Sequence, residues 1–265
     1  MRQLVVTVEP LDVELASDAL WALGVVAVEE RHVGEVIELW TSVGEATDVD
    51  LTWPWRFVEV DATVAETWRQ FAAPMWVEPD LVVRPAWVSL DAPDATVLVI
   101  EPGATFGMGD HPTTQLTLLA ARRWVRPSTR VLDVGCGSGV LAVGAMVFGA
   151  ARAVGIDIAP AAVPVTHANA SANRVRVEVS TTPLEDVEGE FDLVLANILA
   201  PTLVALAPNL RRVLAPGGTL IISGILAGAH QHVLDAMAPL EVVTTDYLDD
   251  WVAVTLMWTG GSSVG

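Results

Sequence analysis

The hydrophobic positions of the first sixty residues predict a small α+β unit. Apolar side chains recur at helical spacing over residues 11–23, and the segments around this helix are rich in the valine and isoleucine that strands favour. Strands are expected at residues 3–8, 25–30, 35–40 and 56–60. The second and third of these strands are separated by a turn near Gly34, which predicts a hairpin.

Residues 61–95 show no such regular pattern and are interpreted as a linker. One short helix is expected within it, over residues 63–72, because Pro74 would end a helix there. We therefore predict two domains, at residues 1–60 and 96–258. The linker joins them, and a disordered tail follows at residues 259–265.

From residue 96 the pattern alternates between short apolar segments and helical periodicity. Strands are expected at residues 96–100, 131–135, 153–158, 175–180, 191–197, 219–225, 241–248 and 251–258, and helices at residues 113–125, 138–149, 160–172, 201–214 and 227–238. This alternation predicts an α/β fold with a doubly wound, mostly parallel sheet of seven strands and helices on both faces. The last two segments flank the turn Asp249-Asp250, so a final hairpin should place one antiparallel strand at the edge of the sheet.

The composition favours a soluble cytoplasmic protein and argues against a membrane or nucleic acid as a partner. The chain is 52% hydrophobic, has no uninterrupted apolar segment long enough to span a bilayer, and holds a single cysteine, Cys136. Its net charge is −19, and all 14 basic residues are arginine. Such a surface repels phosphates and attracts basic proteins. A compositional bias of the source would produce the same balance, and the sequence leaves both explanations open.

The segment VLDVGCGSG at residues 131–139 carries the strongest chemical signal. A predicted strand ends in Gly135, two further glycines follow, and a helix begins directly afterwards. Glycines let a backbone approach a ligand closely, and a helix N-terminus supplies amide donors. Asp157 ends the next predicted strand, where a carboxylate can reach the hydroxyls of a ribose. The spacing therefore predicts a nucleotide site at the carboxyl ends of these strands.

The positions of the glycines relative to the strand distinguish between two kinds of nucleotide-binding motif. A dinucleotide fingerprint would have to begin at Gly137, after the strand has already ended, and it would leave Asp133 unexplained. The phrase from Val131 to Gly139 instead resembles the first motif of S-adenosylmethionine-dependent methyltransferases. In that family the loop wraps around the methionine part of the cofactor.

Two further segments narrow the resemblance. The loop EPGATFGMGDHPTT precedes the glycine motif, and LVLANILA, with Asn197 near its centre, follows it. Together the three segments are similar to the PrmA-type methyltransferases, which are protein-lysine N-methyltransferases of ribosomal large-subunit protein eleven. The resemblance covers residues 96–258, and a fainter similarity extends from Trp68 to Pro74.

The resemblance implies a cofactor, a partner and a set of contacts. The cofactor would be S-adenosyl-L-methionine, no metal is expected, and the partner would be a basic ribosomal protein recognised by a ferredoxin-like N-terminal domain. A loop with Phe106, Gly107 and Gly109 would close over the cofactor. Further cofactor contacts are expected at Thr114, Asp133, Gly135, Gly137, Gly139, Asp157, Ile158 and Asn197.

Asn197 is also the expected catalytic residue. N-methylation requires a neutral amine, and holding a lysine neutral at pH 7 costs about 4 to 5 kcal/mol because its free pKa is about 10.4. A side-chain oxygen at the end of a central strand can accept an N–H bond and aim the lone pair of the nitrogen. Asn197 resembles the asparagine that opens the amine-site motif of other amino-methyltransferases, although the prolines and aromatic residue of that motif are absent here.

Several of these residues also have a purely structural interpretation. Asn197 could cap the next helix, and Asp157 could be an ordinary carboxylate at a strand end. His111 is a candidate general base, but hydrogen bonds to its own loop would explain it as well. Cys136 is expected to be a small buried residue and not a nucleophile. Pro164 fits the predicted helix only within its first turn.

Other functions stay open as alternatives. The same fold serves methyltransferases of other proteins and of small molecules, and a regulator that binds the cofactor without catalysis would keep the same glycine motif. A nicotinamide-dependent oxidoreductase is disfavoured by Asp133 and by the final hairpin. The N-terminal part, about 95 residues long, is shorter than the recognition domain and linker of the resembled family.

Overall fold

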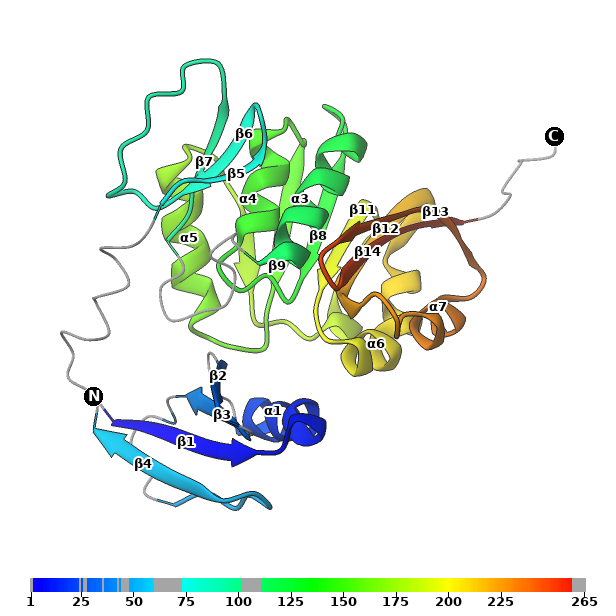
Figure 1. Ribbon diagram of the computed structural model, residues 1–265. Coiled ribbons are helices and arrows are strands. Elements are labelled where there is room, and N and C mark those ends of the chain that lie inside the picture. Colours follow the sequence, from blue (N-terminus) through cyan, green and yellow to red (C-terminus); the bar gives the residue numbers. More distant parts are fainter. Residues whose placement is uncertain are drawn as a thin grey trace. The chain divides into compact units, whose positions relative to one another are not determined.

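The structure is a computed structural model that describes residues 2–23, 25, 28–34, 36–41, 43, 48–59, 73–101 and 111–258. The chain forms two compact units, one built mainly from residues 1–72 and the other mainly from residues 73–265 (Figure 1). The domain boundaries expected near residues 60 and 95 stay predictions. The helix expected at residues 63–72 and the tail at 259–265 lie outside the described residues.

In its described residues, the N-terminal unit is a four-stranded antiparallel sheet with one helix packed on it. Its strands are β1 (Arg2–Val8), β2 (Val28–Val33), β3 (Val36–Thr41) and β4 (Trp55–Glu59), in the order β2-β3-β1-β4. Helix α1 (Val13–Ala22) follows a 3-10 turn at Pro10–Asp12 and buries Leu20 against Leu4 and Leu39 of the sheet. This strand order confirms the ferredoxin-like expectation. In the described part of the connection from β3 to β4, residues 43 and 48–54, there is no second helix.

A three-stranded sheet that the sequence pattern did not predict opens the second unit. Strands β5 (Met75–Glu78) and β6 (Leu81–Arg84) form a hairpin, and β7 (Thr96–Val99) runs parallel to β6. The strand expected at residues 96–100 therefore forms, but it pairs with β6 and does not join the large sheet. Leu81, Val83 and Leu98 are buried in the same hydrophobic cluster as helices of the large sheet.

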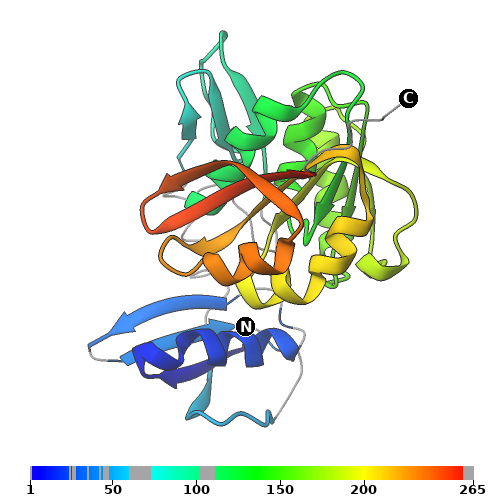
Figure 2. The same cartoon turned by 90° about the vertical axis from the view of Figure 1, so that its right-hand side faces the viewer.

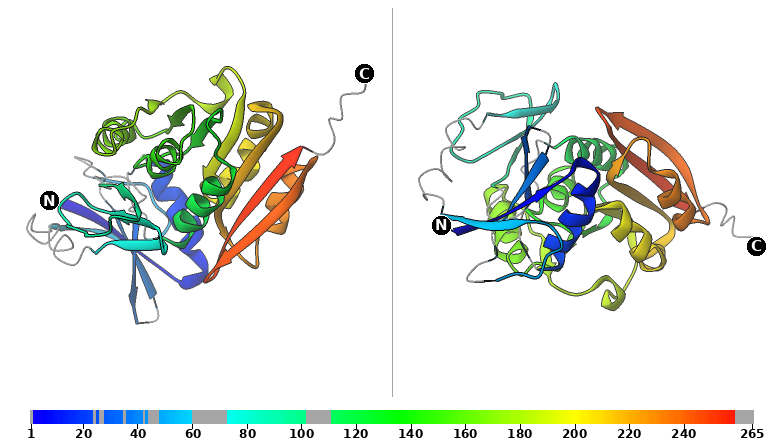
Figure 3. Two further views of the ribbon diagram at one scale, coloured as in Figure 1. Left: turned by 90° about the horizontal axis from the view of Figure 1, so that it is seen from above. Right: turned by 60° about the horizontal axis from the view of Figure 1, so that its bottom comes forward.

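The large sheet has seven strands in the order β10-β9-β8-β11-β12-β14-β13. Their bounds are β8 (Arg130–Val134), β9 (Arg152–Ile156), β10 (Glu178–Ser180), β11 (Phe191–Asn197), β12 (Leu214–Leu226), β13 (Leu240–Leu248) and β14 (Trp251–Trp258). The strands from β10 to β12 pair in parallel, and β14 is antiparallel to both neighbours, which confirms the predicted mostly parallel sheet. The antiparallel strand lies one place inside the edge and not at it, because β13 pairs with its outer side (Figure 3).

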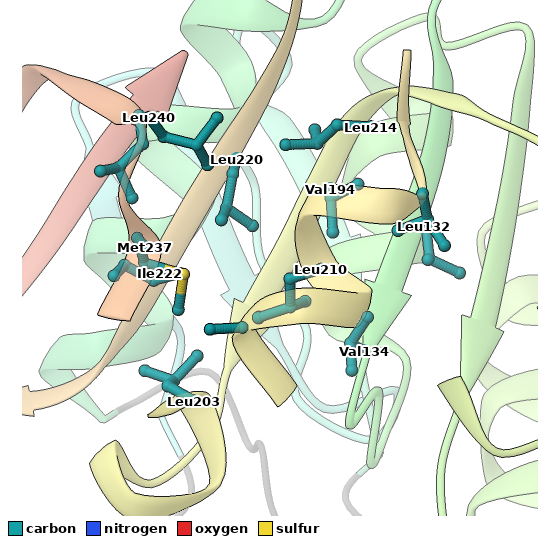
Figure 4. Packing of buried hydrophobic residues seen from close by; sticks show 14 of the residues in the cluster. Leu132, Val134, Val194, Leu203, Leu210, Leu214, Leu220, Ile222, Met237 and Leu240 are labelled. Atoms are coloured by element: carbon teal, nitrogen blue, oxygen red, sulfur yellow. The ribbon is translucent and has the colours of Figure 1, made fainter. Parts of the chain in front are cut away.

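Helices cover both faces of this sheet, as the alternating pattern predicted. They are α3 (Pro112–Trp124), α4 (Val140–Val147), α5 (Ala162–Ala172), α6 (Ala200–Arg212) and α7 (Gln231–Met237). Neighbouring residues of a strand point to opposite faces. Leu132 and Val194 therefore belong to one cluster with residues of α6 and α7 (Figure 4), whereas Val131 and Leu193 belong to a second cluster with residues of α3, α4 and α5. Helices α6 and α7 lie side by side on their face (Figure 2).

The position of Pro164 agrees with the expectation from the sequence. Pro164 is the third residue of α5, so it lies in the first turn, where its missing N–H costs no helical hydrogen bond. Within the described ranges, no helix combines the length and apolar character needed to cross a membrane.

The fold brings the candidate site residues to one edge of the large sheet. The parallel strands β9, β8, β11 and β12 are neighbours in that order, so their carboxyl ends lie side by side. Gly135 follows β8, Asp157 follows β9, Asn197 ends β11, and Gly224 lies near the end of β12. Ligands of open α/β sheets bind at this edge.

Candidate functional site

The glycine turn after β8 depends on the absence of side chains. Gly135 has φ 73°, and a Cβ atom there would overlap Cγ2 of Ile198. Gly139 has φ 77° at the N-cap of α4, and its Cβ would lie 2.6 Å from Cγ2 of Thr166. Both positions therefore combine a left-handed backbone with a close neighbour, which only glycine tolerates. The resulting turn lets a ligand approach the backbone closely. Its own amides are engaged within the protein: those of Gly135 and Gly139 donate to the Ile156 and Cys136 carbonyls.

Asp157 connects this turn to the next strand end. Its Oδ2 accepts a 2.8 Å hydrogen bond from the Gly137 amide, and its Oδ1 accepts one of 2.8 Å from the Ala159 amide. A carboxylate has about four acceptor positions, so two remain for a ligand. The two amide bonds hold the carboxylate in place beside the glycine turn, in the position where a nucleotide ribose binds in sheets of this kind.

Asp133 is a carboxylate that the fold removes from water. It is fully buried in the middle of β8, and its Oδ2 accepts a 3.0 Å hydrogen bond from the Ala142 amide in the first turn of α4. Within the described residues its Oδ1 has no hydrogen-bond partner. Burial raises the pKa of Asp133 to about 7; the Ala142 amide opposes this shift and the charge of Asp157 adds to it. Through its hydrogen bond to Ala142, Asp133 ties the first turn of α4 to β8.

Asn197 presents its amide at the end of β11. The side chain is half-buried, and its Nδ2 lies 3.5 Å from Oγ1 of Thr114, to which it donates. Within the described part of the chain its Oδ1 accepts no hydrogen bond. Helix α6 begins with Leu199 as its N-cap, so the interpretation of Asn197 as the cap of that helix is wrong. The arrangement leaves an amide oxygen free for a ligand at the carboxyl edge of the sheet.

His111 and Cys136 both have structural roles in this site. His111 is the N-cap of α3; its Nδ1 accepts from the Thr113 amide at 3.3 Å, and its ring meets that of Trp251 edge-on. These contacts favour the structural interpretation of His111 over that of a general base. Cys136 is buried, and burial raises the pKa of its thiol well above the ordinary range, so a reactive thiolate is disfavoured.

The remaining candidates are only partly placed. Thr114 is buried in the first turn of α3, next to Asn197, and Ile158 is 89% exposed immediately after Asp157. Phe106, Gly107 and Gly109 lie outside the described residues. Among the described residues there is no cluster of side chains that could hold a metal ion.

Asn169, which the sequence pattern did not single out, links two segments of the site. This asparagine of α5 is 2% exposed; its Oδ1 accepts from the Glu101 amide, and its Nδ2 donates to the Glu101 and Ser138 carbonyls, each at 2.8 Å. One side chain thus ties the glycine turn to the residue where the loop 101–114 begins. The signal in the sequence was the spacing of Thr166, Asn169 and Asn173, which places three polar residues on one face of α5.

The residues present fit the adenosyl cofactor implied by the sequence. The glycine turn permits a close approach to its backbone, and Asp157 has acceptor positions to spare. The apolar side chain of Ile158 lies exposed beside them, where an adenine ring could pack. This fit rests on the edge of the sheet alone and involves no residue outside the described ranges.

Comparison with known proteins decides the family. The sequence model of the family described as Ribosomal protein L11 methyltransferase (PrmA) matches residues 38–258, which is most of the chain. The chain belongs to this family. The sequence resemblance to PrmA-type methyltransferases is thereby confirmed.

Individual PrmA relatives support the same assignment. The chain is 46% identical over 190 residues to the Ribosomal protein L11 methyltransferase of Geobacter metallireducens, a match that covers 71% of this chain and 63% of the relative. It is 40% identical over 206 residues to the protein of the same name from Symbiobacterium thermophilum, covering 76% and 67% of the two chains. The crystal structure of a ribosomal protein L11 methylase from Lactobacillus delbrueckii subsp. bulgaricus has a TM-score of 0.65 and 31% identity, and the match covers 69% of this chain and 97% of that one. The match thus spans about two thirds of the length of the two curated relatives.

Proposed function

We propose that this chain is an S-adenosylmethionine-dependent N-methyltransferase that methylates amino groups of ribosomal protein L11, on lysine side chains and on the N-terminus. The observation that carries the proposal is the placement of Asp157, the glycine turn and Asn197 on neighbouring strand ends in a chain of the PrmA family. A ribosomal substrate implies action in the cytoplasm. Direct contact with nucleic acid is not part of the proposal, because the net charge is −19.

Binding of the cofactor is assigned to the two strand ends at β8 and β9. Asp157 would accept hydrogen bonds from the ribose hydroxyls, and the turn from Gly135 to Gly139, whose glycines carry no side chain, would let the methionine part pack closely against its backbone. Thr114 and Ile158 complete the set of contacts within the described residues, and Phe106, Gly107 and Gly109 belong to it as a proposal from the family resemblance. Asp133, which is fully buried, would act on the cofactor only through the start of α4, to which it is hydrogen-bonded. When bound, S-adenosylmethionine supplies a methyl group that its sulfonium already activates.

Asn197 is assigned the role of binding the substrate amine that accepts the methyl group. Its Oδ1, which no described residue engages, would accept an N–H of a neutral lysine amine and point the nitrogen lone pair toward the methyl group. The hydrogen bond from Asn197 Nδ2 to Thr114 Oγ1 keeps the amide in the orientation that leaves this oxygen free. Removal of the amine from water favours its neutral form, which offsets part of the about 4 to 5 kcal/mol needed at pH 7.

The proposal is tested by transfer of a labelled methyl group. The purified chain is incubated with tritium-labelled S-adenosylmethionine and a lysate from a strain that lacks the corresponding enzyme. We expect the label in the band of ribosomal protein L11, and labelling about a hundredfold slower with Asn197→Ala. Label in another protein or in a small molecule would show that the proposed substrate is wrong and that the proposed methyl transfer is right. Calorimetry gives the second readout: binding of NAD and not of S-adenosylhomocysteine would overturn the proposal as a whole.

A further inference from the structure

Ile198 lies between the glycine turn after β8 and the end of β12. It directly follows Asn197, and its Cγ2 occupies the space that a Cβ on Gly135 would need. The same residue lies on Gly224 at the end of β12, where a Cβ would overlap the Ile198 carbonyl oxygen and approach its carbonyl carbon to 2.8 Å. Ile198 therefore touches the glycine turn with its side chain and β12 with its backbone.

The backbone of Ile198 is fixed independently of these contacts. Its amide donates a 3.2 Å hydrogen bond to the Ser223 carbonyl, and the buried Ser223 hydroxyl donates in turn to the Val252 carbonyl at 2.8 Å. The side chain also packs against the hydrophobic cluster that α6 and α7 share with the sheet. With its backbone held by β12 and its branched Cβ stiff about χ1, Ile198 has little freedom to move.

We infer that Ile198 is a positioning residue: its Cγ2 methyl acts as a spacer that sets the distance between the glycine turn, which holds the methyl donor, and Asn197, which holds the acceptor amine. The inference rests on the proposed function. Transfer of a methyl group needs donor and acceptor in line, and a misplacement of about 1 Å costs about a hundredfold in rate. A rigid contact between the two binding segments is a direct way to keep that distance.

Two conservative variants of Ile198 distinguish the effect of the Cγ2 methyl from the effect of side-chain volume. Ile198→Val keeps both branches at Cβ and loses only the terminal carbon. Ile198→Leu keeps the number of carbons but moves the branch away from Cβ. We expect kcat for methylation of ribosomal protein L11 to stay within about threefold of wild type in Ile198→Val and to fall about a hundredfold in Ile198→Leu. The affinity for S-adenosylhomocysteine should change by less than about fivefold in both variants, so the loss falls on kcat and not on cofactor binding.

A rescue experiment tests the contact without using activity. Gly135→Ala pushes a Cβ into Ile198 Cγ2 and is expected to weaken S-adenosylhomocysteine binding strongly. The double variant Gly135→Ala with Ile198→Ala removes the overlap and should recover about tenfold of that affinity. In the double variant the residue at position 135 still has a strained left-handed backbone, so the affinity for S-adenosylhomocysteine is expected to recover only in part. Gly139→Ala, whose Cβ would meet Thr166 instead, is the matched control that Ile198→Ala should not rescue.

The outcomes separate this inference from the proposed function. If the wild-type chain binds S-adenosylhomocysteine and methylates its substrate but Ile198→Leu keeps wild-type kcat, the spacer assignment is wrong and the function stands. Equal losses in Ile198→Val and Ile198→Leu would also overturn it, because volume and not Cγ2 would then matter. The same holds if the double variant binds no better than Gly135→Ala. Failure of the wild-type chain to bind S-adenosylhomocysteine would reject the proposed function itself.

Discussion

Asp133 combines full burial with a single hydrogen bond from the described residues, and this sets how its charge depends on pH. Its pKa in the folded chain is about 7, raised mainly by burial, whereas an unfolded aspartate titrates near its ordinary value of 3.8. The folded state therefore holds the proton more tightly than the unfolded state. The resulting stabilisation is fully present below the unfolded pKa and is lost as pH rises toward and through 7.

Asp133→Asn should remove this pH dependence while keeping an acceptor oxygen for the Ala142 amide. Between pH 5 and pH 7 the free energy of unfolding of the variant should rise relative to that of wild type by about 2 kcal/mol. Each pH unit contributes at most about 1.4 kcal/mol, and the folded carboxyl is already half ionised at pH 7. Chemical denaturation at both pH values measures the difference. A difference that does not change with pH would show that Asp133 is ionised in the folded chain at pH 5.

Substitution of Asp157 should mainly weaken cofactor binding, whereas substitution of Asn197 should mainly slow turnover. Asp157→Ala removes a charged acceptor and the anchor of the glycine turn, so we expect S-adenosylhomocysteine affinity to fall at least about a hundredfold. Asn197→Ala removes the acceptor proposed for the amine and should lower kcat about a hundredfold with affinity changed by less than about fivefold. Calorimetry and initial rates give both quantities. Equal losses in kcat and affinity for Asn197→Ala would reduce this residue to a cofactor ligand.

Residues whose roles follow from local spacing were predictable, and residues whose roles depend on distant partners were not. The glycines and Asp157 lie at motif positions that follow predicted strands, so their spacing alone assigns them to one edge of the sheet. Asn169 and Ile198 owe their importance to Glu101, Ser138, Gly135 and Gly224, which lie far away in the sequence. The spacing of Asn169 indicates a helix face but says nothing about what that face contacts.

At the scale of elements, helix α5 closes an open strand edge with two asparagines. Asn173 binds the Val99 amide and carbonyl at 2.8 and 2.6 Å, and Asn169 repeats the pattern two residues further along at Glu101. Alternate residues of a strand direct their amide and carbonyl groups to the same side. The two side chains thus take the place of a neighbouring strand beside β7, and only Asn169 also reaches the glycine turn.

This difference makes the two asparagines a matched pair for mutation. Asn169→Ala and Asn173→Ala each leave backbone groups without partners, so each should lower the free energy of unfolding by about 2 kcal/mol. Asn169→Ala should also weaken S-adenosylhomocysteine binding about tenfold, because it releases both the glycine turn and the start of the loop 101–114. Asn173→Ala should leave binding unchanged. Equal effects of both variants on affinity would show that the loss comes from general destabilisation.

Helices and strands were predicted correctly where the hydrophobic period and the length of the segment indicate the same kind of element. The strands and helices from residue 112 onward form close to their expected positions, because alternating βα segments permit few arrangements. Strands β5 and β6 were missed because they lie within residues 61–95, whose irregular pattern was interpreted as a linker, and each is only four residues long. The position of β14 inside the sheet edge depends on long-range pairing with β12, which a hairpin pattern alone does not contain.

At the scale of the whole molecule, the two units have separate hydrophobic cores. The cluster around Leu4, Leu20 and Leu39 belongs to the N-terminal unit, and the two clusters around the large sheet share no residue with it. The described residues that carry the proposed cofactor and amine contacts all lie in the second unit. The proposed cofactor site therefore belongs to the second unit alone, and recognition of a protein substrate by the N-terminal unit stays a prediction.

Removal of residues 1–72 should separate these two activities. The chain 73–265 keeps both clusters of the large sheet and the carboxyl edge with Asp157 and Asn197, so it should fold and bind S-adenosylhomocysteine within about threefold of the full chain. It should lose at least about a hundredfold in kcat/KM for ribosomal protein L11, because a catalytic edge without a recognition surface gains no binding energy from the rest of the substrate. Methylation of free lysine, a substrate too small to contact a second domain, serves as the control and should be equally slow with both chains. If the shortened chain methylates the ribosomal protein as well as the full chain does, recognition belongs to the catalytic unit, and the N-terminal sheet needs another role.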